Sequence, residues 1–210
     1  MQIKKREIKA RLLQSAKDEF LKKGFEKASI REIVKNAGTT IGNFYNYFEG
    51  KEDIFSAIVQ KTYSQISRFV KSHSAKNEDP FVLDRLSIPQ ARKFVSGALS
   101  ILSDDFFVNL ILLTECSDST PYKDTRAKIV SFIGRHFIEH RDLMNSSYID
   151  NGMSRLLSEQ FVAGVLSALK QDVTINHKSE LITDYLLFYV YGMLGLLRNT
   201  ASISPDEETS

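Results

Sequence analysis

The 210-residue chain has only one cysteine, Cys116, and four histidines. A single cysteine cannot form an intrachain disulfide, and the spacing of the cysteine and histidines does not match a Cys/His zinc site. The neighbours Glu115 and Asp118 are acidic, whereas a reactive thiolate needs basic surroundings. We therefore expect Cys116 to be a small buried side chain, and we expect a reducing, cytoplasmic setting.

Long hydrophobic runs are also lacking. The basic start, Met1 to Glu7, is not followed by a continuous apolar segment, so no signal peptide is expected. The longest apolar runs, 106–113 and 185–197, fall short of the ~20 residues that a membrane-spanning helix needs. We interpret both runs as buried helices and expect no membrane partner.

Charge is unevenly distributed along the chain. The net charge is +2, but residues 1–73 carry 15 Lys/Arg against 8 Asp/Glu, and residues 74–210 carry 13 against 18. A basic N-terminal third suits a nucleic-acid partner. A solvated basic face without any partner would have the same composition.

Hydrophobic periodicity predicts a helix-turn-helix near the N-terminus. A first amphipathic helix starts near Ile8 and ends at Gly24, after which Phe25 can fold back on Phe20. A capping box of Ser29 and Glu32 predicts the start of a second, short helix. Gly38 ends it, and Thr40 can cap a third short helix whose buried positions are Ile41 or Phe44, and Phe48. Two short helices around a glycine-containing turn are typical of a helix-turn-helix.

The rest of the chain also has helical periodicity, so we predict an all-α fold. A fourth helix runs from Gly50 to about His73, and the polar segment 74–80 marks a domain junction. Later helices are expected at 89–103, 105–116, 122–144, 154–172 and 179–199. The predicted divisions are a helix-turn-helix DNA-binding domain (1–50), a connecting helix (51–73), a larger helical ligand-binding and dimerisation domain (74–203) and a disordered acidic tail (204–210).

The last two predicted helices are apolar around much of their circumference and contain small residues. Interior glycines weaken a helix by ~1 kcal/mol each relative to alanine, so they suggest close helix packing. That packing is either between subunits or within one core. The candidate dimerisation residues are Ala163, Gly164, Ala168, Gly192 and Gly195.

The stretch from Ala37 to Phe55, AGTTIGNFYNYFEGKEDIF, resembles the turn, recognition helix and following helix of TetR-family regulators. Gly24-Phe25 and the segment 29–33 also stand where that family has them. The resemblance implies a ligand-responsive transcriptional repressor that is not an enzyme and needs no cofactor. Its DNA-binding domain lies at the N-terminus, and the larger helical domain behind it binds a small molecule and dimerises.

The resemblance also assigns roles on and around the recognition helix. Phosphate contacts fall to Thr40, Tyr45, Tyr47 and Lys51, assisted by backbone amides near Ser29 and Gly50. Base contacts fall to Thr39, Ile41, Gly42 and Asn43, and Asn46 faces outward on the same helix. The family often has a polar or basic residue at position 41 and threonine at position 43, so the base specificity of family members cannot be transferred to this chain.

By the same resemblance, the partners are a second copy of the chain, a pseudo-palindromic DNA operator and an unknown small molecule. The last two helices of each subunit would form a four-helix interface, with the recognition helices one DNA turn, ~34–36 Å, apart. Helically spaced aromatics are also typical of a core. The candidate ligand-binding residues are Phe94, Phe106, Phe107, Glu115, Tyr122, Phe132, Arg135, Phe137 and Phe161.

Two other function classes remain open. His136, Glu139 and His140 match the H-x-x-E-H pattern of a zinc-dependent hydrolase, which would need a third ligand such as Glu159 or Glu180. The alternative is two partly exposed histidines on a helix edge. A TetR-like module that acts through a protein partner is the other possibility, against which the basic, aromatic recognition helix argues.

Overall fold

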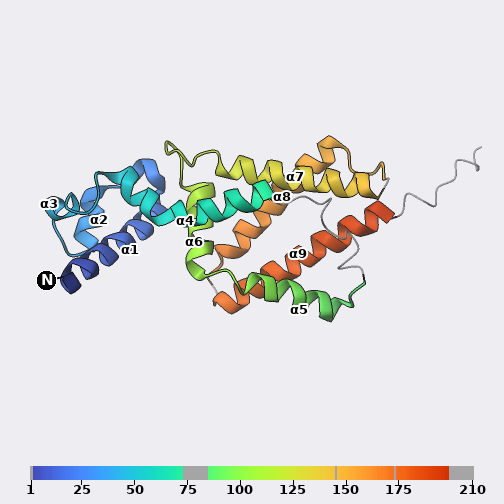
Figure 1. The fold of residues 1–210 in the computed structure, drawn as a ribbon, viewed down its shortest axis with the longest axis horizontal. Helices are drawn as coiled ribbons and strands as arrows, with labels where there is room; N and C mark the ends of the chain where they lie inside the picture. The colour runs from blue at the N-terminus through green and yellow to red at the C-terminus, as the bar shows by residue number, and fades with distance from the viewer. Residues whose placement is uncertain (1, 73–84, 145, 173, 199–210) are drawn as a thin grey trace, which may run out of the picture. The chain divides into compact units, whose positions relative to one another are not determined.

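The computed structural model describes residues 2–72, 85–144, 146–172 and 174–198. Every regular element in these ranges is a helix (Figure 1), so the predicted all-α fold is confirmed. The expected junction at 74–80 and the expected acidic tail at 204–210 lie outside the described residues.

The helices divide into two compact units, which are Met1–Phe69 with Asp105–Arg126, and Val70–Asp104 with Ala127–Ser210. The first unit therefore combines the N-terminal helices with a segment from the middle of the chain. The local sequence pattern does not indicate that segment 105–126 belongs with the N-terminal helices. The predicted division into domains stays a prediction.

The first unit contains α1 (Gln2–Lys27), α2 (Ile30–Asn36), α3 (Ile41–Phe44), most of α4 (Lys51–Ser72) and α6 (Asp104–Glu115). Helix α1 begins six residues before Ile8, where the prediction placed its start. That prediction depended on apolar periodicity, whereas residues 2–7 are Gln, Ile, Lys, Lys, Arg and Glu, mostly good helix formers with a single apolar residue and no apolar stripe.

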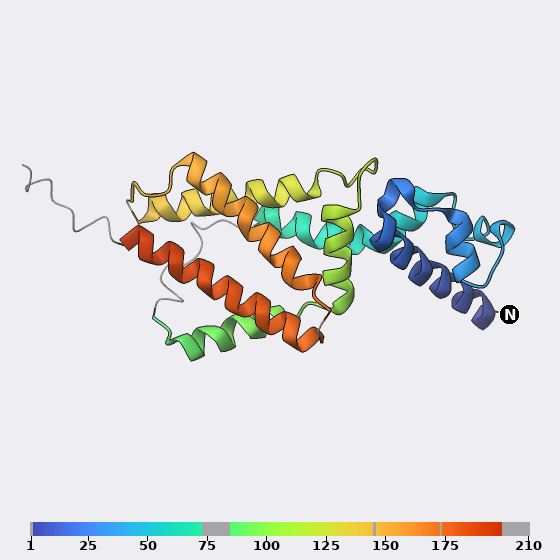
Figure 2. The same ribbon diagram turned by 180° about the vertical axis from the view of Figure 1, so that it is seen from behind.

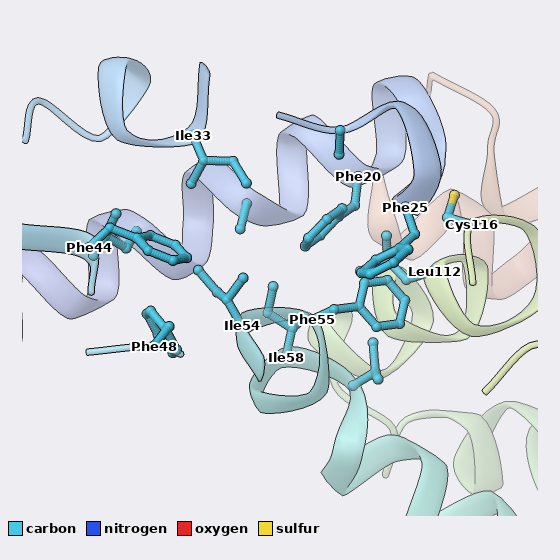
Figure 3. Packing of buried hydrophobic residues seen from close by; sticks show 14 of the residues in the cluster. Phe20, Phe25, Ile33, Phe44, Phe48, Ile54, Phe55, Ile58, Leu112 and Cys116 are labelled. Atoms are coloured by element: carbon cyan, nitrogen blue, oxygen red, sulfur yellow. The ribbon is translucent and has the colours of Figure 1, made fainter. Parts of the chain in front are cut away.

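Aromatic side chains form the centre of the first unit (Figure 3). Gly24 has φ +73°, a conformation that favours glycine, and the helical backbone of α1 is broken by a kink at this residue, where the first helix was predicted to end. Phe25 then stacks on Phe20 with ring centroids 5.9 Å apart, and Phe55 of α4 meets these two rings edge-on at 5.0 and 5.4 Å. Edge-on aromatic pairs stabilise a core by about 0.5–1.5 kcal/mol beyond burial.

The segment 105–126 is tied into this unit by polar bonds. The backbone N–H of Phe25 donates to the Cys116 carbonyl at 3.0 Å, and the Cys116 side chain is buried as expected. The buried Asn109 amide donates to the Ile58 carbonyl of α4 at 3.1 Å. Helix α6 therefore packs directly on the helix that follows the recognition helix.

The hydrogen bond from the Ser29 side chain that the predicted capping box requires at the start of α2 is not formed. Ser29 occupies the N-cap position, but its side chain makes no capping hydrogen bond. Its backbone N–H instead donates to Glu19 of α1 at 3.2 Å, and Lys23 pairs with the same carboxylate at 2.9 Å. Glu19 is buried, with 5% of its surface exposed. A tertiary contact has thus replaced the local one that the Ser29 and Glu32 spacing suggests.

The second unit contains α5 (Ile88–Leu99), α7 (Thr125–Leu143, from Ala127), α8 (Asn151–Leu169) and α9 (Ile175–Arg198). Helix α9 packs against both α5 and α8 (Figure 2). Asp150 caps α8 by accepting from the Met153 N–H at 2.7 Å. Phe137, Ile149, Met193 and Leu197 form a buried cluster in this unit.

The apolar part of helix α9 is longer than the uninterrupted apolar run 185–197. Its 22-residue segment Asn176–Leu197 is long and apolar enough to cross a membrane, so the expectation from 185–197 underestimated its length. A core helix of a soluble protein meets the same criterion, and this single helix is weak support for a membrane span. The absence of a membrane partner stays a prediction.

Gly164 of α8 leaves space that the Tyr185 side chain of α9 occupies. A Cβ atom added there would overlap the Tyr185 hydroxyl group, whose O–H donates to the Gln160 carbonyl at 2.9 Å. Burial and the neighbouring Tyr189 raise the pKa of Tyr185, so its hydroxyl remains a donor. Gly164 therefore serves packing within one chain.

We expect Glu19→Ala to lower the free energy of unfolding by about 1.5–3 kcal/mol, because it removes hydrogen bonds to a buried carboxylate. Burial alone would raise the pKa of Glu19, but the bonds from Lys23 and the Ser29 N–H hold it below its ordinary value of 4.5. The carboxylate therefore stabilises the fold above pH 4.5, and this stabilisation is lost as the pH falls through the lowered pKa.

Urea titrations of the wild type, Glu19→Ala and Glu19→Gln from pH 7 to pH 3 test this expectation. Asp18→Ala is the matched control, because Asp18 is exposed on the same helix. A difference between wild type and Glu19→Gln that stays constant below pH 4.5 would contradict the assignment.

We expect Gly164→Ala to destabilise the protein by about 1–3 kcal/mol, because the new methyl group displaces the Tyr185 ring. Gly97 is an exposed glycine in α5 with no heavy atom within 4 Å of an added Cβ. Gly97→Ala should therefore stabilise the protein by up to about 1 kcal/mol. Denaturant unfolding of both variants measures the contrast, and equal effects would show that Tyr185 does not need the space at Gly164.

Candidate nucleic-acid interface

The short helix α3 is set by one cap and two buried rings. Thr40 is extended (φ −113°, ψ 160°), and its hydroxyl accepts from the Asn43 N–H at 3.2 Å, as predicted for an N-cap. Phe44 and Phe48 are buried, with 0% and 3% of their surfaces exposed, which confirms their expected place in the core. Ile41 is 41% exposed, so Phe44 is the residue of the pair that fills the interior.

Eight of the ten residues predicted to contact DNA lie between residues 39 and 47, on α3 or directly next to it in the sequence, and the other two, Ser29 and Lys51, stand at the starts of α2 and α4. Those exposed to solvent are Thr40, Ile41, Gly42, Tyr45 and Asn46. Those half-buried are Ser29, Thr39, Asn43, Tyr47 and Lys51. Their individual roles stay predictions, but the structure gives a short helix with an inner apolar face and an outer polar and aromatic face.

Asn43 is held in one orientation by its neighbours. Its side-chain N–H donates to the Thr39 hydroxyl at 2.7 Å, and its side-chain oxygen accepts from the Asn46 amide at 3.3 Å. A carboxamide carries two N–H donors and an oxygen with two lone pairs, so one donor and one acceptor remain. These are the two groups that a bidentate contact to adenine requires.

Lys51 joins the start of α4 to the turn between α1 and α2. Its ammonium group donates to the carbonyls of Glu26 and Ala28 at 2.9 and 3.1 Å, and it lies 4.6 Å from the centre of the Phe25 ring. Lysine has three donors, so one is left for another acceptor. Lys51 is therefore a positioning residue in addition to its predicted phosphate contact.

The backbone N–H of Ser29 is already engaged. The resemblance assigns amides near this residue to phosphate, but the Ser29 N–H donates to the carboxylate of Glu19. Sequence reasoning did not single out Glu19. The available signal was its position, because Glu19 is an acid on the same face of α1 as the apolar residues Ala16 and Phe20.

The turn before α3 requires a glycine. Gly38 has φ +63°, a backbone conformation that residues other than glycine adopt only at an energetic cost. An added Cβ at Gly38 would lie 3.6 Å from a guanidinium nitrogen of Arg11, so α1 reaches this turn. Lys9 of α1 lies 5.6 Å from the centre of the Phe48 ring. The sequence analysis did not single out Lys9 and Arg11, because a positive charge was the one feature that marked them.

The candidate ligand-binding residues do not gather in one unit. Phe106, Phe107, Glu115 and Tyr122 belong to the first unit, and the other five belong to the second. Tyr122 is buried in the aromatic core beside Phe55, and its hydroxyl donates to Gln60 at 2.5 Å. Phe94 is 57% exposed on α5. The ligand-binding assignments stay predictions.

The candidate dimerisation residues divide into two groups. Ala168 is buried and Gly164 is filled by Tyr185, so both contribute to packing within the chain. Ala163, Gly192 and Gly195 are exposed, and added Cβ atoms at the two glycines would meet no heavy atom within 4 Å. Only the second group is open to a partner.

The two histidines of the H-x-x-E-H pattern lie close together on α7, with their Nε2 atoms 3.0 Å apart. The expectation that both are partly exposed is wrong for His140, which is buried, whereas His136 is half-buried. Within the described ranges, no group of three His, Cys, Asp or Glu residues is placed to hold a metal ion. The hydrolase alternative thus gains no support from the described residues.

Comparison with known proteins identifies the N-terminal region. Residues 12–58 match the family described as bacterial regulatory proteins, tetR family. The chain is 33% identical over 107 residues to an uncharacterised HTH-type transcriptional regulator, YdgC, of Bacillus subtilis, which covers 49% of this chain and 55% of the relative. It is 26% identical over 95 residues to the HTH-type transcriptional repressor DhaR of a Mycobacterium species, covering 45% and 43%.

The chain thus spans about half the length of the curated relatives it matches. Among solved structures, NalD of Pseudomonas aeruginosa, the secondary repressor of the MexAB-OprM multidrug efflux pump, is 18% identical. The alignment covers 92% of this chain and 96% of NalD, with a TM-score of 0.45. Over residues 12–58, the sequence match agrees with the resemblance of the motif around α3 to the tetR family of bacterial regulatory proteins.

Proposed function

We propose that the protein is a homodimeric transcriptional regulator that binds double-stranded DNA through α3. The observation that carries this proposal is the outer side of α3, where Thr40 and Asn46 are exposed and Asn43 is half-buried, while Phe44 and Phe48 anchor the helix in the core. A short helix presented in this way suits the major groove, where a few side chains read base edges.

Specific and non-specific contacts are divided between α3 and its neighbours. Asn43 reads an adenine with its remaining donor and acceptor, and Ile41 contacts a thymine methyl group. Thr40, Tyr45, Tyr47 and the third donor of Lys51 contact phosphates, which position the helix without reading sequence. Thr39 and Asn46 hold the Asn43 amide in place before DNA arrives.

Regulation follows from a ligand that favours a DNA-incompetent state of the dimer. The Mycobacterium relative DhaR is named a repressor, and we propose that this chain also represses until a small molecule releases it from the operator. Moving the population from 99:1 to 1:99 requires that the ligand bind the released state better by about 5.5 kcal/mol. An apolar or aromatic ligand suits the candidate ligand-binding residues, most of which are aromatic.

The dimer forms through α8 and α9. Along α9, Phe188, Gly192, Gly195 and Leu196 recur at helical spacing and are all exposed, with Phe188 at 74%. Met153 and Leu156 add exposed apolar surface on α8. The glycines leave room for a partner helix to approach closely, and the aromatic and aliphatic side chains supply apolar area to bury.

We expect Asn43→Ala to weaken binding to the preferred duplex by about 1–3 kcal/mol per half-site and to relax selection at one base pair. The preferred duplex is first selected by the wild-type protein from a random library. Titration of that duplex and of its scrambled version then separates base reading from general affinity. Asn36→Ala, at the exposed end of α2, is the control. Equal weakening on both duplexes would make Asn43 a phosphate contact.

We expect Gly192→Arg to convert the dimer to monomers, because a long charged side chain would occupy the space that the partner helix needs. Gly97→Arg is the matched control, since Gly97 is also an exposed helical glycine with open space around it. Sedimentation velocity at micromolar concentration gives the oligomeric state of each. A wild-type protein that sediments as a monomer, or a Gly192→Arg variant that remains dimeric, would refute the α8–α9 interface.

A further inference from the structure

The first turns of α1 lie beside the recognition helix. The N-terminus of α1 is at the same end of the first unit as α3 in both views (Figures 1 and 2). Lys9 of α1 contacts the ring of Phe48, which follows α3, at 5.6 Å. The Arg11 guanidinium lies against Gly38, in the turn that precedes α3. Two cations of α1 thus reach the two ends of the recognition helix.

The described part of the chain supplies no ion pair to these cations. Lys5, Arg6, Lys9 and Arg11 are exposed, and none forms an ion pair with another residue in the described part of the chain. Four other cations of the same unit are paired, Lys17 with Asp105, Lys23 with Glu19, Lys35 with Glu32 and Arg126 with Glu115.

The local composition leaves this surface strongly positive. From residue 2 to residue 17, Glu7 is the single acid. The like charges of Lys5, Arg6, Lys9 and Arg11 repel one another within about two helical turns. Among the described residues, no carboxylate forms an ion pair with them to offset that repulsion. An anionic partner at this surface would offset it.

We infer that α1 is an additional DNA-contacting element, in which Lys5, Lys9 and Arg11 bind the phosphates that flank the groove occupied by α3. This inference rests on the proposed function, because α3 must face DNA for these cations to reach its backbone. Lys9 and Arg11 contact phosphates at opposite ends of the recognition helix, and Lys5, one turn before Lys9, extends the contact. The contacts add affinity for any sequence and carry no base specificity.

The test is the salt dependence of binding to a fluorescently labelled 40-bp duplex of mixed sequence. Each phosphate contact to B-DNA contributes about 0.9 to the slope of log Kobs against log salt. Lys9→Gln/Arg11→Gln should therefore lower the slope by about 1.8 per subunit. Lys22→Gln/Lys61→Gln removes the same charge from exposed sites in the same unit and should leave the slope unchanged. Lys22 is about 20 Å along α1 from Lys9.

Two further variants keep the test decisive if Lys9→Gln/Arg11→Gln disturbs the fold. Lys5→Gln removes a cation that makes no contact with the core and should lower the slope by about 0.9 per subunit. Lys9→Arg retains the charge and should retain the slope. If the wild type binds the duplex and both Lys5→Gln and Lys9→Gln/Arg11→Gln keep its slope, the inference about α1 is wrong while the proposed function stands. If the wild type binds no duplex at any salt concentration, the proposed function itself fails.

Discussion

Burial of Phe44 and Phe48 is the constraint on which the candidate interface depends. Helix α3 has only four residues, and a helix of that length has no stability of its own in water. Complete burial of a phenylalanine side chain contributes about 1.5–3 kcal/mol, so the two rings supply what the backbone hydrogen bonds of α3 cannot. The remaining side chains of α3 are then free to face outward, because the core already holds the helix.

Polar bonds between helices set the finer geometry of the same unit. Glu19 of α1 receives the N–H at the start of α2, and Lys51 of α4 donates to carbonyls at the end of α1. Asn109 of α6 donates to a carbonyl of α4. Each bond joins elements that are distant in sequence, so the orientation of α2 and α3 depends on α1, α4 and α6 together. A change in any of these helices would alter the presentation of the outer face of α3.

Small residues on α8 and α9 serve two different purposes. Gly164 admits the Tyr185 hydroxyl to a backbone carbonyl of its own chain, whereas Gly192 and Gly195 border open space on the outer side of α9. The sequence treats these glycines alike, since each is a residue without a side chain in an apolar helix. Only the position of the neighbouring helix separates a packing glycine from one that is available to a partner.

The helical periodicity and the glycine positions were sufficient to predict the all-α fold, the helix-turn-helix, the break in the first helix at Gly24 and the inward direction of Phe44 and Phe48. These features follow from local spacing and backbone preference, which can be read from a single segment. The sequence did not reveal that Glu19 replaces the capping box, that α6 belongs to the N-terminal unit, or that Lys9 and Arg11 of α1 reach the two ends of α3. Those features are contacts between residues far apart in the chain, and they exist only once the helices have packed, because packing decides which donor meets which acceptor.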